Sequence, residues 1–436
     1  MHPKALLETC ADLLAQTLKF DHPADATVAR FFREHRQLGP RERHALSDAV
    51  YAVLREKPRL EWLAARHPSA AAEGKGERKA ALPRRLALLA LAAQAGRADV
   101  SSVAADEVEQ AWLVESLSCA QALPADAPPE CHHLLPAWLA ERLRLELGEG
   151  FEALAAALAE PGSLDLRVNA LKAKRTAVLK SLAEAGLAAV ATPYAPLGVR
   201  LQGKPSLARL PLYADGLVEV QDEGSQLLAL LLEPRRHEVV VDFCAGAGGK
   251  TLALGAAMRN TGRLYAFDTS AHRLEALQPR LQRSGLSCVH PMAIAHENDD
   301  RIRRLDGKVD RVLVDAPCSG LGTLRRSPDL KWRQTEAGVA ELAQLQARIL
   351  ASAARLVKPG GRLVYATCSL LPEENEAVAS AFGAAHRDFL PLAAAEVLQH
   401  AGAGHATDLV RGNCLRLWPH RHATDGFFAA IWQRKP

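Results

Sequence analysis

The chain has 436 residues and 48% of them are hydrophobic, so it is long enough for two or three domains with buried cores, and disorder is excluded as its overall state. Its net charge of +4 is the difference between 54 basic and 50 acidic side chains, a balance that does not by itself indicate nucleic-acid binding. No apolar run is long enough to span a bilayer and the N-terminus lacks the apolar core of a signal peptide, so we expect a cytoplasmic protein with no membrane partner.

The first part of the chain predicts a helical domain over residues 1–122. Leucines recur at helical spacing over residues 6–18, and Pro40 is well placed to open a second helix. Small and polar residues predict a loop-like break over residues 68–79. Residues 123–130 contain two adjacent prolines and cannot continue a helix, so we place a domain boundary there.

The second part, residues 135–233, predicts a small α+β module, which we expect to be RRM-like and to bind RNA. Apolar and polar residues alternate over residues 164–168, which is typical of a strand, and a helical pattern follows over residues 176–185. Short strands are predicted near residues 199–201 and 217–220.

The third part, residues 234–436, predicts a doubly wound α/β domain of the Rossmann-like kind. Four buried-strand runs alternate with helical patterns, which favours a parallel sheet. The runs are residues 239–241, 264–267, 312–314 and 363–366. Residues 415–418 and 427–432 predict a final antiparallel hairpin.

A glycine-rich loop connects the first strand of this domain to a helix. It reads Asp242-Phe-Cys-Ala-Gly-Ala-Gly-Gly-Lys-Thr251, and its small residues let the backbone approach a ligand at the N-terminus of that helix. Asp268 ends the next strand, where it can accept hydrogen bonds from ribose hydroxyls. A P-loop is disfavoured because Cys244 stands where its first glycine should be. Dinucleotide binding is the other candidate, but neither reading explains two cysteines further along the chain.

These two cysteines follow the ends of the third and fourth of the four buried-strand runs. One lies in Asp315-Ala-Pro-Cys318-Ser-Gly and the other in Ala366-Thr-Cys368-Ser. Because ligands bind at the carboxyl ends of strands in open α/β sheets, we expect both thiols to border one crevice with the glycine loop and Asp268. The other cysteines include no pair with zinc-ligand spacing, and we expect no metal site.

Two thiols at one ligand site suit methylation at carbon 5 of a pyrimidine. That carbon is a poor nucleophile until a thiolate adds to carbon 6, after which it can attack a methyl sulfonium. Asp315 could hold the ring nitrogen and the amino group of cytosine as negative charge develops. A second thiol or another base near carbon 5 would then help to eliminate the enzyme.

Several motifs resemble those of the Nop/Sun family of RNA cytosine-5 methyltransferases. This resemblance covers about residues 135–432. The helical segment before it resembles, more weakly, the NusB-like RNA-binding domain of the bacterial Sun/RsmB branch. That likeness lies in Arg41–Arg43 and Val50–Arg55. The family-like blocks are Leu166-Arg-Val-Asn169, Val220-Gln-Asp-Glu-Gly-Ser-Gln226, Cys244-Ala-Gly-Ala-Gly-Gly-Lys-Thr251, Asp315-Ala-Pro-Cys-Ser-Gly-Leu-Gly322, Leu324-Arg-Arg-Ser-Pro-Asp-Leu-Lys-Trp332, Thr367-Cys-Ser369, Pro372-Glu-Glu-Asn-Glu376 and Asp425-Gly-Phe-Phe428.

The resemblance implies a role for each residue that matches a family motif. It implies that Cys368 is the nucleophile, that Cys318 assists release of the methylated product, and that Asp315 lies beside the cofactor and the target base. The residues implied to bind the cofactor, S-adenosylmethionine, are Cys244, Ala245, Gly246, Ala247, Gly248, Gly249, Lys250, Asp268 and Asp315. The resemblance to the Sun/RsmB branch makes small-subunit ribosomal RNA the leading substrate, by analogy.

Two departures from the family pattern concern cofactor binding. Ala247 stands where the family often has proline. The family also places an aspartate after the third strand to bind adenine, and here His296, Asn298 and Asp299 are three open candidates.

A basic run follows the first cysteine turn and is expected to hold RNA phosphates near the target base. Its residues are Arg325, Arg326, Lys331 and Arg333. We expect a monomer. Two other functions are weighed against the methyltransferase: a catalytically idle RNA-binding or assembly factor on the same fold, and an enzyme that methylates an exocyclic amine or an oxygen, which needs no cysteine pair.

Overall fold

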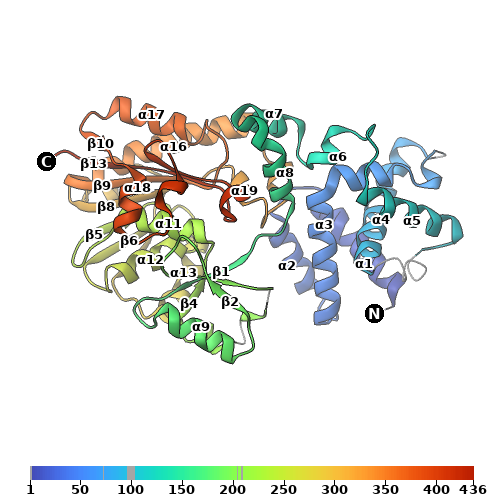
Figure 1. Ribbon diagram of the computed structural model, residues 1–436, viewed down its shortest axis with the longest axis horizontal. Helices are drawn as coiled ribbons and strands as arrows, with labels where there is room; N and C mark the ends of the chain where they lie inside the picture. The colour runs from blue at the N-terminus through green and yellow to red at the C-terminus, as the bar shows by residue number, and fades with distance from the viewer. Residues whose placement is uncertain (1, 72, 96–103, 204, 208–209) are drawn as a thin grey trace. The chain divides into compact units, whose positions relative to one another are not determined.

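The computed structural model describes residues 2–71, 73–95, 104–203, 205–207 and 210–436, which form two compact units (Figure 1). The first unit contains Met1–Glu160 and, from much later in the chain, Leu324–Gln334. The second unit contains Pro161–Thr323 and Thr335–Pro436. Among the described residues, no helix has both the length and the apolar composition that a membrane span requires.

The first unit is built from helices, as the sequence predicts for its N-terminal part. Leucines, alanines and valines from α1, α3 and α4 pack into its buried core, together with Phe31 and Trp112. The helices are α1 (Pro3–Thr17), α2 (Ala24–Glu34), α3 (Pro40–Ala64), α4 (Lys75–Ala95), α5 (Glu107–Gln121), α6 (Pro129–His133), α7 (Ala137–Leu147), α8 (Phe151–Ala159) and α15 (Leu330–Arg333), with 3-10 turns at Pro68–Ala71 and Gly148–Gly150.

Two features of this unit differ from the predicted pattern. The predicted break over residues 68–79 is too long, because α4 begins at Lys75, where the Glu77 carboxylate accepts the backbone N–H of Gly74 (2.9 Å) and so caps the first turn. The compact helical unit also extends to Glu160 rather than to residue 122. One reason is that α6 joins α3, since Arg59 Nε donates to the carbonyl of Cys131 (3.2 Å).

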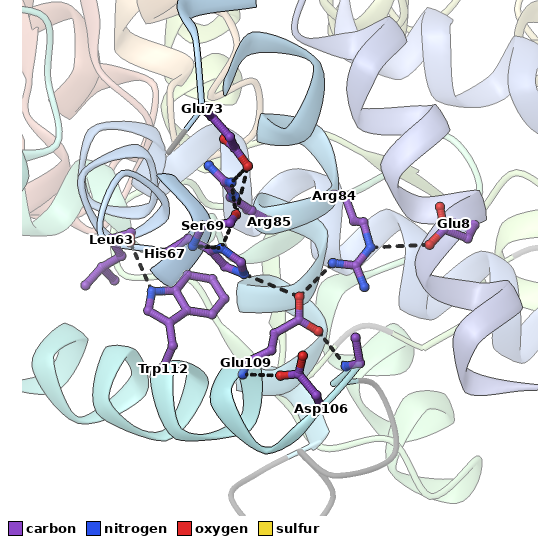
Figure 2. Close-up of polar contacts among 11 residues, drawn as sticks. Glu8, Leu63, His67, Ser69, Glu73, Arg84, Arg85, Asp106, Glu109 and Trp112 are labelled. Carbon is purple, nitrogen blue, oxygen red and sulfur yellow. Dashed lines mark hydrogen bonds and ion pairs between the residues drawn. The ribbon is translucent and has the colours of Figure 1, made fainter. Parts of the chain in front are cut away.

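A network of charged side chains around the buried Glu109 joins α4, α5 and the turn that follows α3 (Figure 2). Glu109 is 5% exposed and accepts hydrogen bonds from Arg84 Nη1 (2.7 Å) and from the backbone N–H of Ala105 (2.6 Å). His67 Nε2 lies 3.4 Å from the same carboxylate. Burial, followed by the charge of Arg85, lowers the pKa of His67. The carboxylate of Glu109 therefore holds together three segments that are distant in sequence.

The late segment Leu324–Gln334 is anchored in this unit by its own side chains. Asp329 accepts the backbone N–H of Ala24 (3.2 Å), and the indole N–H of Trp332 donates to the carbonyl of Leu54 (2.7 Å). A stretch that follows the Cys318 turn in sequence is thus part of the helical unit.

The second unit begins with a small antiparallel sheet in the order β2-β3-β1-β4. Its elements are β1 (Leu164–Val168), α9 (Arg175–Glu184), β2 (Ala189–Ala191), β3 (Gly198–Leu201), α10 (Pro211–Ala214) and β4 (Val218–Val220). Leu166, Val168 and Val199 of the strands pack against Val178 and Leu182 of α9. The strands and the helix predicted in this region are confirmed.

The larger sheet runs β11-β12-β13-β9-β8-β5-β6-β7. Strands β5 to β9 are parallel, and β13 is antiparallel to β9, with Phe428 opposite Thr367. Its strands are β5 (Val239–Asp242), β6 (Arg263–Asp268), β7 (Val289–Ala293), β8 (Val309–Asp315), β9 (Val357–Thr367), β11 (Val410–Arg411), β12 (Cys414–Leu417) and β13 (Phe427–Arg434), and β10 (Phe389–Pro391) pairs with β13. The doubly wound fold and the pairing of the last two predicted strands are confirmed.

Helices cover both faces of this sheet, as Figure 1 shows. The apolar side chains of α16 and α17 pack on one face, and those of α11, α12, α13 and α18 pack on the other. These helices are α11 (Glu223–Leu232), α12 (Gly249–Ala257), α13 (Ala271–Ser284), α16 (Glu336–Leu356), α17 (Glu376–Ala385) and α18 (Ala394–His400), with short α14 (Asp300–Arg303) and α19 (Pro419–His422) in the connections. The strand order turns outward on both sides of β5, so the carboxyl ends of β5 and β8 lie at a topological switch point.

Candidate active site

A cavity of about 570 Å³ opens at the carboxyl ends of β5, β6, β8 and β9. This size is typical of a small-molecule site. The walls include six of the seven residues predicted from the glycine loop, and also Asp268, Asp315, Cys318 and Cys368. The six are Cys244, Ala245, Gly246, Ala247, Gly249 and Lys250. The structure therefore brings together residues from four strand ends, as the fold class predicts.

The glycine loop owes its shape to two residues with left-handed backbone angles. Gly246 has φ +56° and Gly248 has φ +81°. A Cβ atom on Gly248 would lie 2.1 Å from Leu277 Cδ1, so a side chain there would push α13 away. Gly248 caps the N-terminus of α12, which begins at Gly249. Gly248 is the one predicted loop residue that shapes the cavity without being part of its wall.

Asp268 supports the glycine loop as well as lining the cavity. It is 7% exposed, and its Oδ2 accepts the backbone N–H of Gly246 (2.8 Å) while its Oδ1 accepts that of Ser270 (2.7 Å). Each carboxylate oxygen has a second lone pair, which can accept a ligand hydroxyl.

Asp242 is a buried acid beneath the same loop. Its Oδ2 accepts the hydroxyl of Thr251 (2.7 Å), which ties the end of β5 to α12. Burial raises the pKa of Asp242 to about 7, and the hydrogen bond from Thr251 opposes this rise. The sequence alone assigns no role to this acid, because a strand-end aspartate in the motif does not reveal whether it faces the ligand or the core.

Lys250 and Asp315 form an ion pair inside the cavity, with 2.6 Å between Nζ and Oδ2. Burial alone would lower the pKa of Lys250, but the charge of Asp315, the hydrogen bond to it and the charge of Cys368 together raise that pKa. The ammonium therefore stays protonated beside the two acidic groups. Asp315 keeps 28% of its side chain exposed, so it remains accessible to a ligand.

The two predicted cysteines meet at the wall of this cavity. The Sγ atoms of Cys318 and Cys368 are 3.3 Å apart. The hydrogen bond to Cys368, followed by burial, raises the pKa of Cys318 well above its usual range. The two turns interlock, because Gly322 donates its backbone N–H to the carbonyl of Cys368 (2.8 Å). A Cβ atom on Gly322 would lie 2.8 Å from that carbonyl oxygen and 2.1 Å from the carbonyl oxygen of Gly426.

After the third strand in chain order, the cavity is lined by Ile294 and Glu297, neither of which was predicted from the sequence. Asp299 instead caps α14, accepts the backbone N–H of Ala295 (2.8 Å) and pairs with Arg301. These bonds, first of all the one from Arg301, lower the pKa of Asp299.

His296 and Asn298 are also engaged locally. His296 Nδ1 lies 3.1 Å from the backbone nitrogen of Asn298, and the Asn298 side chain accepts a hydrogen bond from Arg355 (3.1 Å). Neither they nor Asp299 are among the cavity-lining residues. Spacing alone could not separate Glu297 from its polar neighbours.

The predicted RNA-contacting residues Arg325, Arg326, Lys331 and Arg333 belong to the helical unit. The prediction is wrong for Lys331, which is 2% exposed and donates from Nζ to the carbonyls of Arg55 and Leu134 (2.7 Å each). Burial lowers its pKa from 10.5 to about 7. Its stem and ammonium complete the core of the unit, so it is not available to a phosphate. For the three arginines, RNA contact stays a prediction.

Two family profiles match the chain. Residues 229–433 match the family described as 16S rRNA methyltransferase RsmB/F. Residues 135–208 match the one described as Methyltr_RsmF/B-like, ferredoxin-like domain, which begins at the residue predicted for the α+β module.

Individual relatives cover different shares of the chain. This chain is 41% identical to the probable ribosomal RNA small subunit methyltransferase B of Synechocystis sp.. The match covers 68% of this chain and 66% of the relative, so this chain spans just under two thirds of the length of that relative. It is 30% identical to the ribosomal RNA small subunit methyltransferase B of Erwinia tasmaniensis, over 91% of each chain. The crystal structure of a methyltransferase homolog protein from Pyrococcus horikoshii is similar with a TM-score of 0.59 and 32% identity, over 70% of this chain and 97% of that one.

Proposed function

Because this chain belongs to the RsmB/F family of 16S rRNA methyltransferases, we propose that it transfers a methyl group from S-adenosylmethionine to carbon 5 of a cytosine in small-subunit ribosomal RNA. The resemblance to the Sun/RsmB branch is thereby confirmed. The observation that carries the proposed chemistry is the thiol pair, with the Sγ atoms of Cys318 and Cys368 3.3 Å apart in one cavity with the glycine loop. Methylation of an exocyclic amine or an oxygen would leave this pair unexplained.

The cavity fits S-adenosylmethionine. Its volume of about 570 Å³ lies in the range of small-ligand sites, and the loop lies at the N-terminus of α12, where the first backbone N–H groups have no partner within the helix. Asp268 has lone pairs for the ribose hydroxyls. When bound, the cofactor supplies a methyl group on a positively charged sulfur.

The chain's own residues prepare the base for attack. In the proposed reaction the Cys368 thiolate adds to carbon 6 of cytosine, and the electron pair of the ring double bond makes carbon 5 nucleophilic. Asp315 accepts a hydrogen bond from the cytosine amino group. Lys250, which is 2.6 Å from Asp315, faces the negative charge that develops on the ring. Carbon 5 would accept the methyl group as the bond from that group to the cofactor sulfur breaks, which would leave a neutral thioether. The methylated carbon 5 then still carries one proton.

Cys318 is proposed to remove that proton as a thiolate, after its own proton has passed to water in the cavity that it lines. The electrons of the broken carbon–hydrogen bond restore the ring double bond as the bond between Cys368 and carbon 6 breaks, which regenerates the Cys368 thiolate. In the free protein, the bond to Cys368 is the largest cause of the raised pKa of Cys318. That contribution is removed while Cys368 is bonded to carbon, so Cys318 ionises more readily at the stage that needs a base.

The test is transfer of labelled methyl from S-adenosylmethionine to unmodified small-subunit ribosomal RNA, followed by bisulfite mapping of the product. We expect one 5-methylcytosine, in a loop where the base can leave its stack. Label on an amine or on oxygen would contradict the proposed chemistry, and no label at all would favour an RNA-binding or assembly factor. A cytoplasmic location and a monomeric state remain predictions.

A further inference from the structure

Glu374 is a fully buried carboxylate directly behind the two cysteine turns. Its Oε1 accepts the backbone N–H of Ser319 (2.8 Å) and the side-chain amide of Gln346 (2.9 Å). Its Oε2 accepts the hydroxyl of Ser319 (2.5 Å) and that of Ser369. Four donors around one carboxylate suit its ionised form. Ser319 follows Cys318 in sequence and Ser369 follows Cys368, so one acid holds both turns.

We propose that Glu374 is the positioning residue that holds the two cysteine turns together and that its charge keeps Cys318 protonated in the free protein. This inference deepens the proposed function and rests on it for its catalytic meaning. It explains how two thiols in hydrogen-bond contact can take different roles.

The charges around the two thiols are opposite in sign. The ammonium of Lys250 interacts electrostatically with Cys368 on the cavity side, and this interaction contributes to the raised pKa of Lys250. On the buried side, Glu374 contributes to the raised pKa of Cys318, after the hydrogen bond to Cys368, burial and the charge of Cys368. The phenol of Tyr365, which also interacts with Cys318, has its own pKa raised chiefly by burial and supplies no positive charge there.

Further buried groups fix the position of Glu374 itself. Gln346, which is fully buried, bridges Glu374 Oε1 and the carbonyl of Pro317 (3.0 Å), next to Cys318. Tyr365 places its hydroxyl 3.0 Å from Gln346 Oε1. The carboxylate therefore cannot turn away from the cysteine turns without breaking several buried hydrogen bonds.

The experiment measures the pH dependence of iodoacetamide alkylation at Cys318 in the full chain without RNA, by mass spectrometry of the peptide that contains it. Glu374→Gln keeps the size of the side chain and its ability to bond both serines, but removes the charge. We expect the alkylation midpoint of Cys318 to fall by on the order of one pH unit, a tenfold gain in reactivity at a fixed pH below both midpoints. Glu373→Gln, which removes the preceding acid, is the matched control and should leave the midpoint in place.

Ser319→Ala is the second variant and predicts a shift of opposite sign. This variant keeps the carboxylate charge of Glu374 but removes one hydroxyl that donates to it. The negative charge is then less stabilised by hydrogen bonds and acts more strongly on Cys318, so the pH midpoint of Cys318 alkylation should rise. A role in packing alone would loosen the site and move both variants in the same direction. Equal shifts, or no shift in Glu374→Gln, would overturn the inference. If Glu374→Gln does not fold, Ser319→Ala decides alone: a higher midpoint supports the inference, and an unchanged or lower one overturns it.

The alkylation assay needs neither RNA nor S-adenosylmethionine. A failure of the proposed function would therefore appear as missing methyl transfer in the wild-type protein, whatever the alkylation shows. A failure of the inference would appear as an unmoved Cys318 midpoint in a variant of an active enzyme.

Discussion

Replacing Lys331 with methionine should remove a specific increase in stability at alkaline pH. Lys331 is 2% exposed, and burial lowers its pKa from 10.5 to about 7. In the unfolded chain the same ammonium titrates near pH 10.4. Between these two values the unfolded state binds more protons than the folded state, so the free energy of unfolding must rise as the pH rises.

The size of the effect follows from the two pKa values. At pH 7 about half of the folded molecules carry a protonated Lys331, whereas nearly all unfolded molecules do. Integration of the proton difference gives an increase of roughly 3 to 4 kcal/mol in the free energy of unfolding between pH 7 and pH 10. Methionine preserves the apolar stem but cannot titrate. It also leaves the carbonyls of Arg55 and Leu134 without this donor, which affects stability about equally at every pH.

The assay is urea unfolding of the full chain at pH 7, 8, 9 and 10, followed by circular dichroism. The quantity of interest is the difference between wild type and Lys331→Met, because other groups that titrate in this range cancel. Lys19→Met, at an exposed lysine of the same unit, is the control and should follow the wild-type slope. Parallel curves for wild type and Lys331→Met would refute the buried position of the ammonium and reopen its role as a phosphate contact.

Three further changes test other parts of the account. Asp268→Ala should weaken S-adenosylmethionine binding by roughly 1.5–3 kcal/mol through loss of a charged acceptor, and unchanged affinity by calorimetry would refute its role. Arg325→Gln together with Arg326→Gln should weaken RNA binding and flatten its salt dependence; if affinity and slope both persist, the two arginines do not contact phosphates. Glu109→Gln should lower the free energy of unfolding by roughly 2 kcal/mol because its charge-assisted bond to Arg84 is weakened, and an unchanged thermal midpoint would argue against the network of Figure 2.

The sequence was sufficient to predict the parts of the site that depend on chain direction. Parallel strands bring their carboxyl ends to one edge, so residues that follow different strands could be assigned to one crevice without knowledge of their contacts. This is why Asp268, Asp315, Cys318 and Cys368 were expected together, and all four line the cavity. The doubly wound class followed from the same alternation of strand and helix.

Parts that depend on tertiary contacts could not be predicted in this way. Lys331 stands in a basic run that looks like a solvated surface, and only the packing of Leu324–Gln334 into the helical unit shows that it is buried. Glu374 lies in an acidic block several residues beyond the end of β9, so spacing gave no reason to connect it to the turn at Cys318. Asp299 had the expected residue type after the third strand, but it caps α14 instead, and Glu297 lines the cavity.

The most direct test of the account is a denaturing gel of the protein incubated with RNA and S-adenosylmethionine. It compares Cys318→Ala, Cys368→Ala, the double variant and Cys414→Ala, a half-buried cysteine of β12 that serves as the control. We predict a covalent protein–RNA adduct that accumulates only in Cys318→Ala, because attack and methylation proceed there while elimination is impaired. Cys368→Ala should remain folded but transfer no methyl group. An adduct that persists in the double variant would show that Cys368 is not the nucleophile, and an adduct seen only with Cys368→Ala would show that the two cysteines have the opposite roles.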